Sequence, residues 1–222
     1  MRTSGSIPLD AQNAFHYHLV LVDLSMDKDR RDRILDVAID LAAAGGYENV
    51  RQRDVADQAG IALGTLYKSF SSKEHILSAA IEREADELEK RLKSRPPAGD
   101  TPTERLQALF KIITRAMCHK PKYARAVIRA MASGQPGVAS HVTAYQGRMN
   151  AIIGSVMRVD EREIDEHQLA LATLLQQIWF ASLVAWSAGI FSQGDVNSHM
   201  SQAIELILAS PKTHGLRPIR AE

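Results

Sequence analysis

Residues 54–70 read DVADQAGIALGTLYKSF, and this stretch gives the strongest indication of the fold of the chain. Apolar residues recur at helical spacing on both sides of Gly60. These positions are Val55, Ala56, Ala59, Leu66 and Phe70. Gly60 stands where a helix ends in a left-handed residue, a conformation that glycine adopts without steric cost. Two short helices joined by such a turn form a helix-turn-helix, whose second helix, here starting near Leu63, enters the major groove of DNA.

Further residues around this stretch stand at the spacing of a known family. They are Ile34, Leu35, Asp36, Val37, Ala38, Gly46, Tyr47, Arg53, Gly64, Thr65, Tyr67, Lys73 and Leu77. With them, residues 34–77 resemble the TetR family of bacterial transcriptional repressors. The resemblance implies a three-helix DNA-binding domain followed by a helical domain that binds a ligand and forms a homodimer. The chain departs from the family at Arg51 and Ala62, where a capping hydroxyl is usual, and at Ser69, where an aromatic residue is usual.

The composition favours an all-α protein of about nine helices. The chain has 222 residues, of which 45% are hydrophobic and 24% charged, and strand-like alternation of β-branched residues is rare. The net charge is only +1, so DNA binding has to be argued from the position of the charges. The single cysteine, Cys118, excludes an intramolecular disulfide and suits a reducing cytoplasm, where we expect the protein to act.

Other classes of protein find no support in the residues. The longest apolar run, over residues 178–191, is shorter than the roughly twenty residues that span a bilayer, and no signal peptide is evident. The sequence has no Ser-His-Asp, paired-acid or phosphate-loop arrangement, and its eight histidines lack metal-ligand spacing. We therefore expect no enzyme, membrane protein, metal site or cofactor.

The chain is predicted to divide at a loop over residues 94–100, which holds Pro96, Pro97 and Gly99. Residues 1–25 show no helical period, so they are expected to be a disordered leader or to precede a biological start at Met26. The expected units are the leader (1–25), the DNA-binding domain with a connecting fourth helix (26–94), the ligand-binding and dimerisation domain (95–211) and a tail (212–222). A capping box of Ser71 and Glu74 is predicted to open the fourth helix.

Basic residues near the motif are candidates for contact with DNA. Lys28, Arg30 and Arg31 are placed in the first turn of a helix that starts near Asp27, where cations oppose the helix dipole unless a phosphate lies nearby. The resemblance implies a base contact for Arg53 and a phosphate contact for Lys73 at a helix N-terminus. The predicted DNA-binding residues are Lys28, Arg30, Arg31, Gln52, Arg53, Leu63, Gly64, Thr65, Tyr67, Lys68 and Lys73. The alternative is that these charges form a solvated surface.

The second domain carries Met and aromatic side chains at helical spacing, which fit either an adaptable apolar cavity or a plain core. The predicted ligand-binding residues are Phe110, Met117, Tyr123, Val127, Met131, Tyr145, Met149 and Trp179. A helix over about 166–190 is apolar on more than one face, so these faces all have to be covered. We expect a partner subunit to pack against this helix. The predicted dimer contacts are Leu171, Leu175, Ile178, Ser182, Trp186, Met200, Ile204 and Ile207.

Two segments of this domain narrow the expected ligand. Arg115-Ala116-Met117 and the run IWFASLVAW over residues 178–186 resemble the KstR group, which regulates cholesterol catabolism in actinobacteria. That resemblance implies a small hydrophobic effector from steroid breakdown, such as a CoA thioester, which releases the repressor from a near-palindromic operator. Two alternatives remain: a regulator for which the ligand is a corepressor or activator, and a helical acyl-binding carrier without DNA activity.

Overall fold

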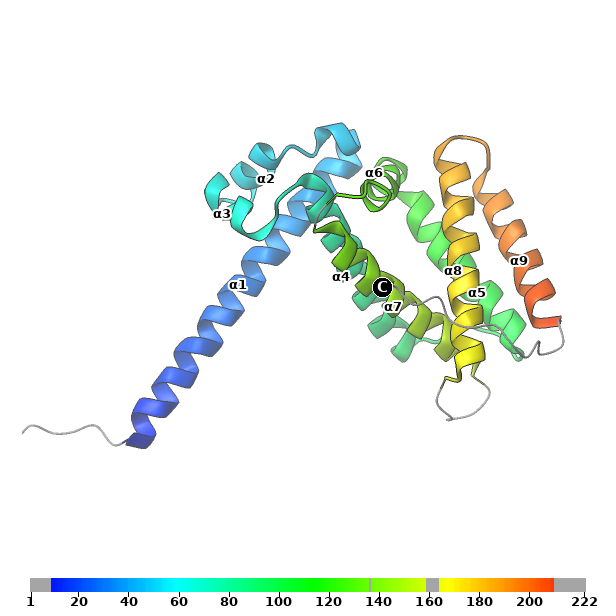
Figure 1. Cartoon of the computed structure of the whole chain (residues 1–222), viewed down its shortest axis with the longest axis horizontal. Coiled ribbons are helices and arrows are strands. Elements are labelled where there is room, and N and C mark those ends of the chain that lie inside the picture. The colour runs from blue at the N-terminus through cyan, green and yellow to red at the C-terminus, as the bar shows by residue number, and fades with distance from the viewer. Residues whose placement is uncertain (1–8, 136, 159–163, 210–222) are drawn as a thin grey trace, which may run out of the picture.

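The computed structural model describes residues 9–135, 137–158 and 164–209, with side chains described from Asp27 onward. Over these residues the protein has nine α-helices, one short 3₁₀ turn and no strand, so the predicted all-α class is confirmed (Figure 1). The elements are α1 (Leu9–Gly45), η1 (Tyr47–Asn49), α2 (Gln52–Gln58), α3 (Leu63–Ser69), α4 (Lys73–Ser94), α5 (Pro102–His119), α6 (Pro121–Met131), α7 (Val138–Met157), α8 (Glu166–Ser187) and α9 (Gln193–Ala209).

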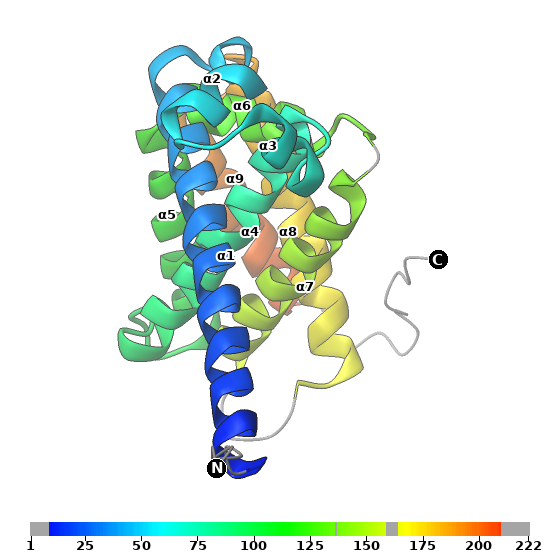
Figure 2. The ribbon, with the colours of Figure 1, turned by 90° about the vertical axis from the view of Figure 1, so that its left-hand side faces the viewer.

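The helix-turn-helix forms as the sequence predicts. Gly60 has a φ of 67°, which is the left-handed conformation expected at the end of α2. The amide of Ile61 donates to the carbonyl of Ala56 at 3.0 Å and closes the turn before α3. Val55, Leu66 and Phe70 are fully buried against α1, so the two short helices are held mainly by their apolar faces. In Figure 2, α2 and α3 lie at one end of the molecule beside α1.

Helix α1 is much longer than predicted. It begins at Leu9, eighteen residues before the expected start near Asp27. No glycine or proline occurs between Pro8 and Gly45, so nothing in this segment interrupts a helical hydrogen-bond ladder. The expected disorder of the leader is therefore wrong for residues 9–25, and residues 1–8 lie outside the described residues. The first half of α1 extends away from the other helices in Figure 1.

The remaining helices form a body joined to the head, which we define as residues 27–70. Helix α4 runs from the head into the body and packs against α1, α6 and α7. On the far side of the body, α5, α8 and α9 lie side by side (Figure 1). Because α4 packs against α1 as well as against α6 and α7, it connects the head with the body.

Helix caps account for most of the correct boundaries. The capping boxes of Thr101 with Glu104 and of Asp165 with Gln168 are both present. The first opens α5 directly after the predicted loop over residues 94–100, and the second opens α8 where predicted. The predicted Ser71–Glu74 box is wrong. Ser72, not Ser71, caps α4 by accepting from the amide of His75 at 3.1 Å. The side chain of Glu74 accepts a hydrogen bond from the hydroxyl of Tyr47.

Candidate DNA-binding face and ligand cavity

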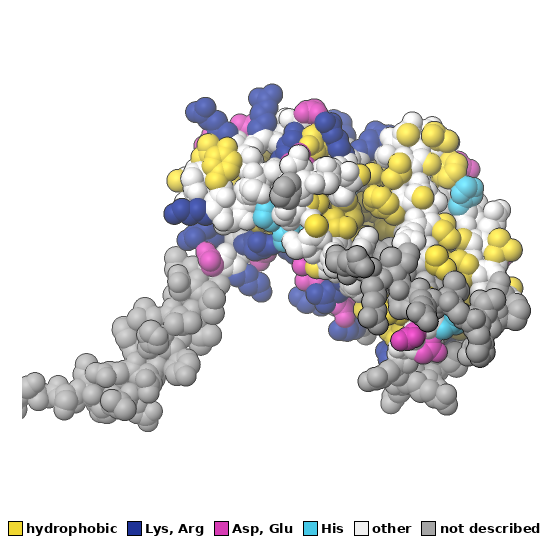
Figure 3. All heavy atoms as spheres, viewed as in Figure 1, with side chains coloured by type: hydrophobic (Ala, Val, Ile, Leu, Met, Phe, Trp, Pro, Cys, Tyr) yellow, Lys and Arg dark blue, Asp and Glu magenta, His cyan; other side chains and the backbone are white. Residues whose placement is uncertain are grey.

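Helix α3 presents the side opposite its buried Leu66 to solvent. Tyr67 is 52% exposed, Gly64 and Lys68 are also exposed, and Leu63 and Thr65 are half-buried. Arg53, in the first turn of α2, is exposed as well, whereas Gln52 donates from its side-chain amide to the carbonyl of Phe70 at 3.2 Å. Figure 3 shows Lys and Arg side chains around this end of the molecule. The predicted contact residues on α2 and α3 thus share one region of the surface, with Gln52 holding the two helices together.

The basic residues of α1 sit differently from the prediction. Because α1 starts at Leu9, Lys28, Arg30 and Arg31 lie in the middle of the helix, where an argument from the helix dipole does not apply. Arg30 pairs with Asp27 at 3.0 Å, and the guanidinium of Arg31 lies 5.0 Å from the centre of the Phe70 ring. The position of Arg31 near the end of α3 therefore comes from packing, and contact of the three basic residues with DNA stays a prediction.

Lys73 is held in place by the head. Its ammonium group donates to the carbonyl of Tyr47 at 3.2 Å, lies 3.5 Å from a Glu48 carboxylate oxygen and stands 3.8 Å from the centre of the Tyr47 ring. Burial and the hydrogen bond to Glu74 raise the pKa of Tyr47 to about 12, so its hydroxyl remains a donor at neutral pH. Lys73 is thus preorganised at the start of α4, beside the end of the head, and 24% of its side chain is exposed.

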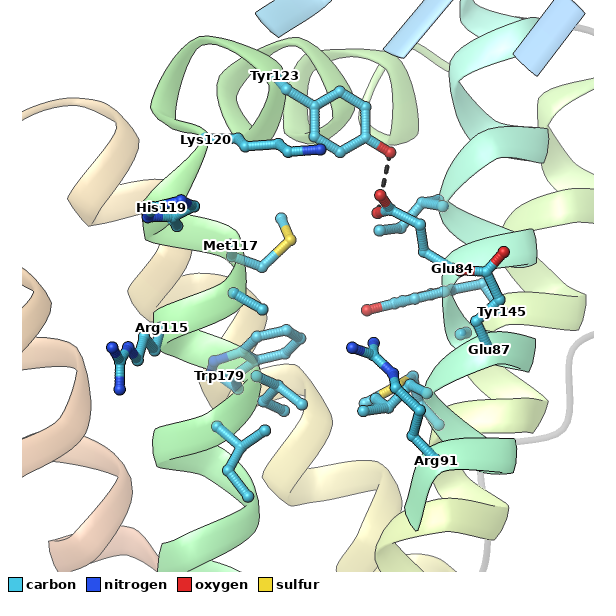
Figure 4. A pocket seen from close by; sticks show the side chains of 17 residues that line it. Glu84, Glu87, Arg91, Arg115, Met117, His119, Lys120, Tyr123, Tyr145 and Trp179 are labelled. Carbon is cyan, nitrogen blue, oxygen red and sulfur yellow. Dashed lines mark hydrogen bonds between the residues drawn. The ribbon is translucent and has the colours of Figure 1, made fainter. Parts of the chain in front are cut away.

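A cavity of about 670 Å³ lies in the body. The helices α4, α5, α6, α7 and α8 all contribute to its wall (Figure 4). Its volume falls in the range of small-molecule sites in proteins. The side chains that line it are those of Ile81, Glu84, Ala85, Glu87, Leu88, Arg91, Ile112, Ile113, Arg115, Ala116, Met117, His119, Lys120, Tyr123, Tyr145, Met149 and Trp179.

Five of the eight predicted ligand-binding residues line this cavity: Met117, Tyr123, Tyr145, Met149 and Trp179. Met131 instead lines a neighbouring cavity of about 220 Å³, which shares Tyr145 and Trp179 with the larger one. Phe110 and Val127 belong to neither lining set and are packed into the core, with the Phe110 ring edge-on to Trp179 at a centroid distance of 6.1 Å. These two side chains pack as core residues, and their contact with a ligand stays a prediction.

Helix α4 also contributes to the cavity, which was not predicted. Glu84 and Arg91 line the cavity among the charged residues from Glu82 to Lys93, whereas all the predicted ligand-binding residues lie on α5 to α8. The usable signal was Ile81, Ala85 and Leu88, which interrupt those charges at helical spacing and form a stripe toward the body. Arg115, His119 and Lys120 add exposed basic groups from α5 and the turn that follows it.

Several of the polar groups that line the cavity have defined partners or surroundings. The Tyr123 hydroxyl donates to a Glu84 carboxylate oxygen at 3.0 Å, and burial raises the pKa of Glu84. Burial also raises the pKa of Tyr145, with a smaller contribution from the charge of Glu84. The indole N–H of Trp179 donates to the hydroxyl of Thr114 at 2.9 Å, behind the cavity wall. The cavity therefore combines apolar side chains with two phenols, an acid that burial drives toward its protonated form, and the further charged or basic side chains of Glu87, Arg91, Arg115, His119 and Lys120.

The predicted dimer contacts require a correction. Leu171, Leu175, Ser182, Trp186, Met200 and Ile204 are buried within the single chain, because α8 packs on α7 and α9 packs on α5 and α8. Only Ile178 and Ile207 remain partly exposed. The apolar side chains that α8 and α9 leave at the surface are Leu169, Val184 and Leu206, which are 37%, 42% and 73% exposed. An apolar pattern on both faces does not tell which face the chain itself covers.

Two further expectations concern classes of protein. Within the described residues, α8 is long and apolar enough to cross a membrane by length and composition, but half of its most apolar window is buried in the body, as in the core helix of a globular domain. The described part of the chain holds no group of three or more His, Cys, Asp or Glu side chains suited to a metal ion.

An exposed recognition helix in a small head, joined by α4 to a helical body that encloses a cavity, defines a ligand-responsive DNA-binding regulator. Two family profiles match the chain: "Bacterial regulatory proteins, tetR family" over residues 34–80, and "Tetracyclin repressor-like, C-terminal domain" over residues 99–207. The chain belongs to the TetR family of transcriptional repressors.

Similar proteins cover most of the chain. The transcriptional repressor KstR of Rhodococcus jostii is 38% identical over 188 residues, which are 84% of this chain and 87% of that protein. The crystal structure of a TetR regulator from Rhodococcus sp. RHA1 has a TM-score of 0.75 at 25% identity and covers 83% of this chain and 98% of its own. The fold is also that of Thermus thermophilus FadR in complex with lauroyl-CoA, with a TM-score of 0.63, 18% identity and coverage of 86% and 98%.

Proposed function

We propose that the protein is a homodimeric repressor that leaves a near-palindromic operator when a hydrophobic CoA thioester, either an acyl-CoA or a steroid-derived one, binds in the cavity between α4 and α5. The observation that carries this proposal is the composition of that cavity. Met117, Met149 and Trp179 provide an adaptable apolar wall, and Arg115 and Lys120 provide exposed cations at its edge. A CoA thioester combines these two chemistries in one molecule, since its apolar chain is joined to a phosphate-bearing carrier.

The similar proteins support this choice of effector class. The structurally similar FadR of Thermus thermophilus was crystallised with lauroyl-CoA, and the relative that is 38% identical is named KstR. In the cell such a regulator acts in the cytoplasm, where operator DNA and CoA thioesters meet.

We assign DNA binding to the exposed side of α3 and the residues beside it. Arg53 and Thr65 contact bases, Tyr67 contacts a phosphate or a base, and Lys68 and Lys73 contact the backbone. The two heads of a dimer bind half-sites separated by whole turns of the duplex. The dimer forms through the exposed side chains of α8 and α9, among them Val184 and Leu206.

The test begins with selection of an operator from random DNA by the purified protein. Fluorescence anisotropy then follows its release during titration with palmitoyl-CoA, with free CoA as the control. Release by palmitoyl-CoA alone supports the proposal. Tighter binding would make the ligand a corepressor, and binding of palmitoyl-CoA without affinity for any DNA at low salt would indicate an acyl carrier.

A pair of variants tests whether the cavity is the effector site. Met149→Trp fills part of the cavity wall, so operator binding should persist while palmitoyl-CoA no longer releases the DNA. Ile190→Trp adds the same side chain at a position that is 73% exposed and does not line the cavity, and its response should match that of the unaltered protein. An unchanged response of Met149→Trp would place the effector elsewhere.

A further inference from the structure

Three polar side chains from three different helices meet on the wall of the cavity. They are Glu84 of α4, Tyr123 of α6 and Tyr145 of α7. The Tyr123 hydroxyl is already used, since it donates to Glu84 at 3.0 Å. The Tyr145 hydroxyl points into the cavity in Figure 4 and makes no hydrogen bond to any residue that the structure describes. The cavity thus holds one phenol donor that its own wall does not satisfy.

The surroundings favour a neutral hydrogen-bond acceptor as the partner of this donor. Tyr145 is buried, and apolar Met149 and Trp179 line the same cavity. The carboxyl group of Glu84 is half-buried, and burial favours its protonated form, in which it also donates. A ligand carboxylate would meet Glu84 as a like charge when that acid is ionised, whereas a carbonyl oxygen accepts from both groups without adding a charge.

The position of these groups matches one point of a CoA thioester. Apolar Met149 and Leu88 line the same cavity, the exposed cation of Lys120 lies near Tyr123, and Arg91 lies on the other side of Tyr145 (Figure 4). In a thioester, the carbonyl oxygen is the polar atom where the apolar chain meets the polar carrier. The cavity holds the same three kinds of group, namely apolar side chains, hydrogen-bond donors and exposed cations.

We propose that Tyr145, assisted by the Glu84–Tyr123 pair, forms a carbonyl-binding subsite that recognises the thioester oxygen of the effector. This inference rests on the proposed function, because it assumes an effector of the CoA thioester class. It adds that the protein distinguishes thioesters from compounds of the same length that lack the carbonyl oxygen.

The experiment compares two compounds that differ at that one position. Palmitoyl-CoA carries the carbonyl, and S-hexadecyl-CoA has a methylene group in its place. Isothermal titration calorimetry on the full-length protein should give a dissociation constant about 3- to 10-fold lower for palmitoyl-CoA, as expected for one net hydrogen bond. In Tyr145→Phe the ratio of the two dissociation constants should fall to about 1, because palmitoyl-CoA binds more weakly while the binding of S-hexadecyl-CoA is unchanged.

Met149→Leu is the matched control, because it alters the same cavity without touching an oxygen atom. It should shift the affinities for both compounds by the same factor and leave the preference intact, and thermal melts confirm that both variants fold. Equal binding of the two compounds by the unaltered protein, or a preference that survives in Tyr145→Phe, would overturn the subsite while the proposed function stands. Failure of both compounds to bind would overturn an acyl-CoA effector and the subsite proposed for it together.

Discussion

Replacing Lys73 by Met should weaken binding to every DNA sequence by a similar factor. Lys73 lies at the N-terminus of α4 beside the head, and it is held there by the Tyr47 carbonyl at 3.2 Å and the Tyr47 ring at 3.8 Å. A lysine in this position reads no bases, and it contributes by neutralising one phosphate and releasing its counterions. Met keeps most of the apolar stem and removes only the charge, so the packing against Tyr47 is largely retained.

The magnitude follows from counterion release. Each neutralised phosphate contributes about −0.9 to the slope of log K against log salt, so a dimer that loses Lys73 from both heads should have a slope shallower by about 1.8. At about 0.1 M salt this corresponds to a loss of about 8-fold in affinity per head, or about 1.2 kcal/mol. The ion pair with Glu48, at 3.5 Å, reduces this loss, because Lys73 has to leave or share that partner on binding. Glu48 is 75% exposed, so solvent screens this ion pair and the correction is small.

Fluorescence anisotropy with operator and with random duplex, at four or more salt concentrations, measures both slopes. Lys93→Met is the control, since it removes the same charge near the other end of α4, where Lys93 is exposed and pairs with Glu89 at 2.9 Å. Glu48→Gln should act in the opposite direction and raise affinity for both DNAs. Slopes for Lys73→Met that equal those of the unaltered protein would refute the assignment of Lys73 to a phosphate.

Three further changes have defined outcomes. Arg53→Ala should flatten the base preference in a competition assay with single-base operator variants, whereas Arg51→Ala, which removes a neighbouring exposed charge, should leave the ranking of those variants unchanged. Thr114→Val leaves the buried Trp179 indole N–H without an acceptor and should lower the free energy of unfolding by about 1–3 kcal/mol in urea, while Thr114→Ser restores most of it. Burial lowers the pKa of His75 from 6.5, so the unfolded chain binds more protons and stability should fall as the pH drops below about 6.5; His75→Gln should make that fall smaller.

Local signals in the sequence were sufficient for the head and for most helix boundaries. Gly60 and the apolar stripes around it specify the turn and the two helices, since both depend on residues within one or two turns of each other. The capping box at Thr101 fixes the start of α5 in the same way. The start of α1 was missed because residues 9–25 carry neither an apolar stripe nor a helix breaker. The absence of a breaker is compatible with a helix but does not predict one.

The cavity and the dimer face depend on which surfaces the chain covers, and periodicity does not report that. Leu175 of α8 was assigned to a partner subunit, but it is fully buried by the chain itself. Val127 was assigned to the ligand, whereas it is fully buried and lines neither of the two cavities that hold the other predicted residues. Glu84 was not among the predicted ligand-binding residues, although it lines a cavity between helices that are distant in sequence. In each case the helical period of the sequence fits either environment, so it could not predict which one the side chain occupies.

The contacts of α6 indicate how small a change in the body can alter the head. This helix of 11 residues contributes Tyr123 to the cavity wall, next to it Lys122 donates to the carbonyl of Ala44 at 2.7 Å, and near the end of the helix Arg129 pairs with Glu48 at 2.8 Å. Arg129 and Glu48 are 60% and 75% exposed, so solvent screens their ion pair and it is weak. An effector needs a differential affinity of about 1–3 kcal/mol between two states to change DNA binding by 5- to 150-fold. Because the contacts of Lys122 and Arg129 with the head are exposed, a movement of α6 can break them and shift the head without unfolding its buried core.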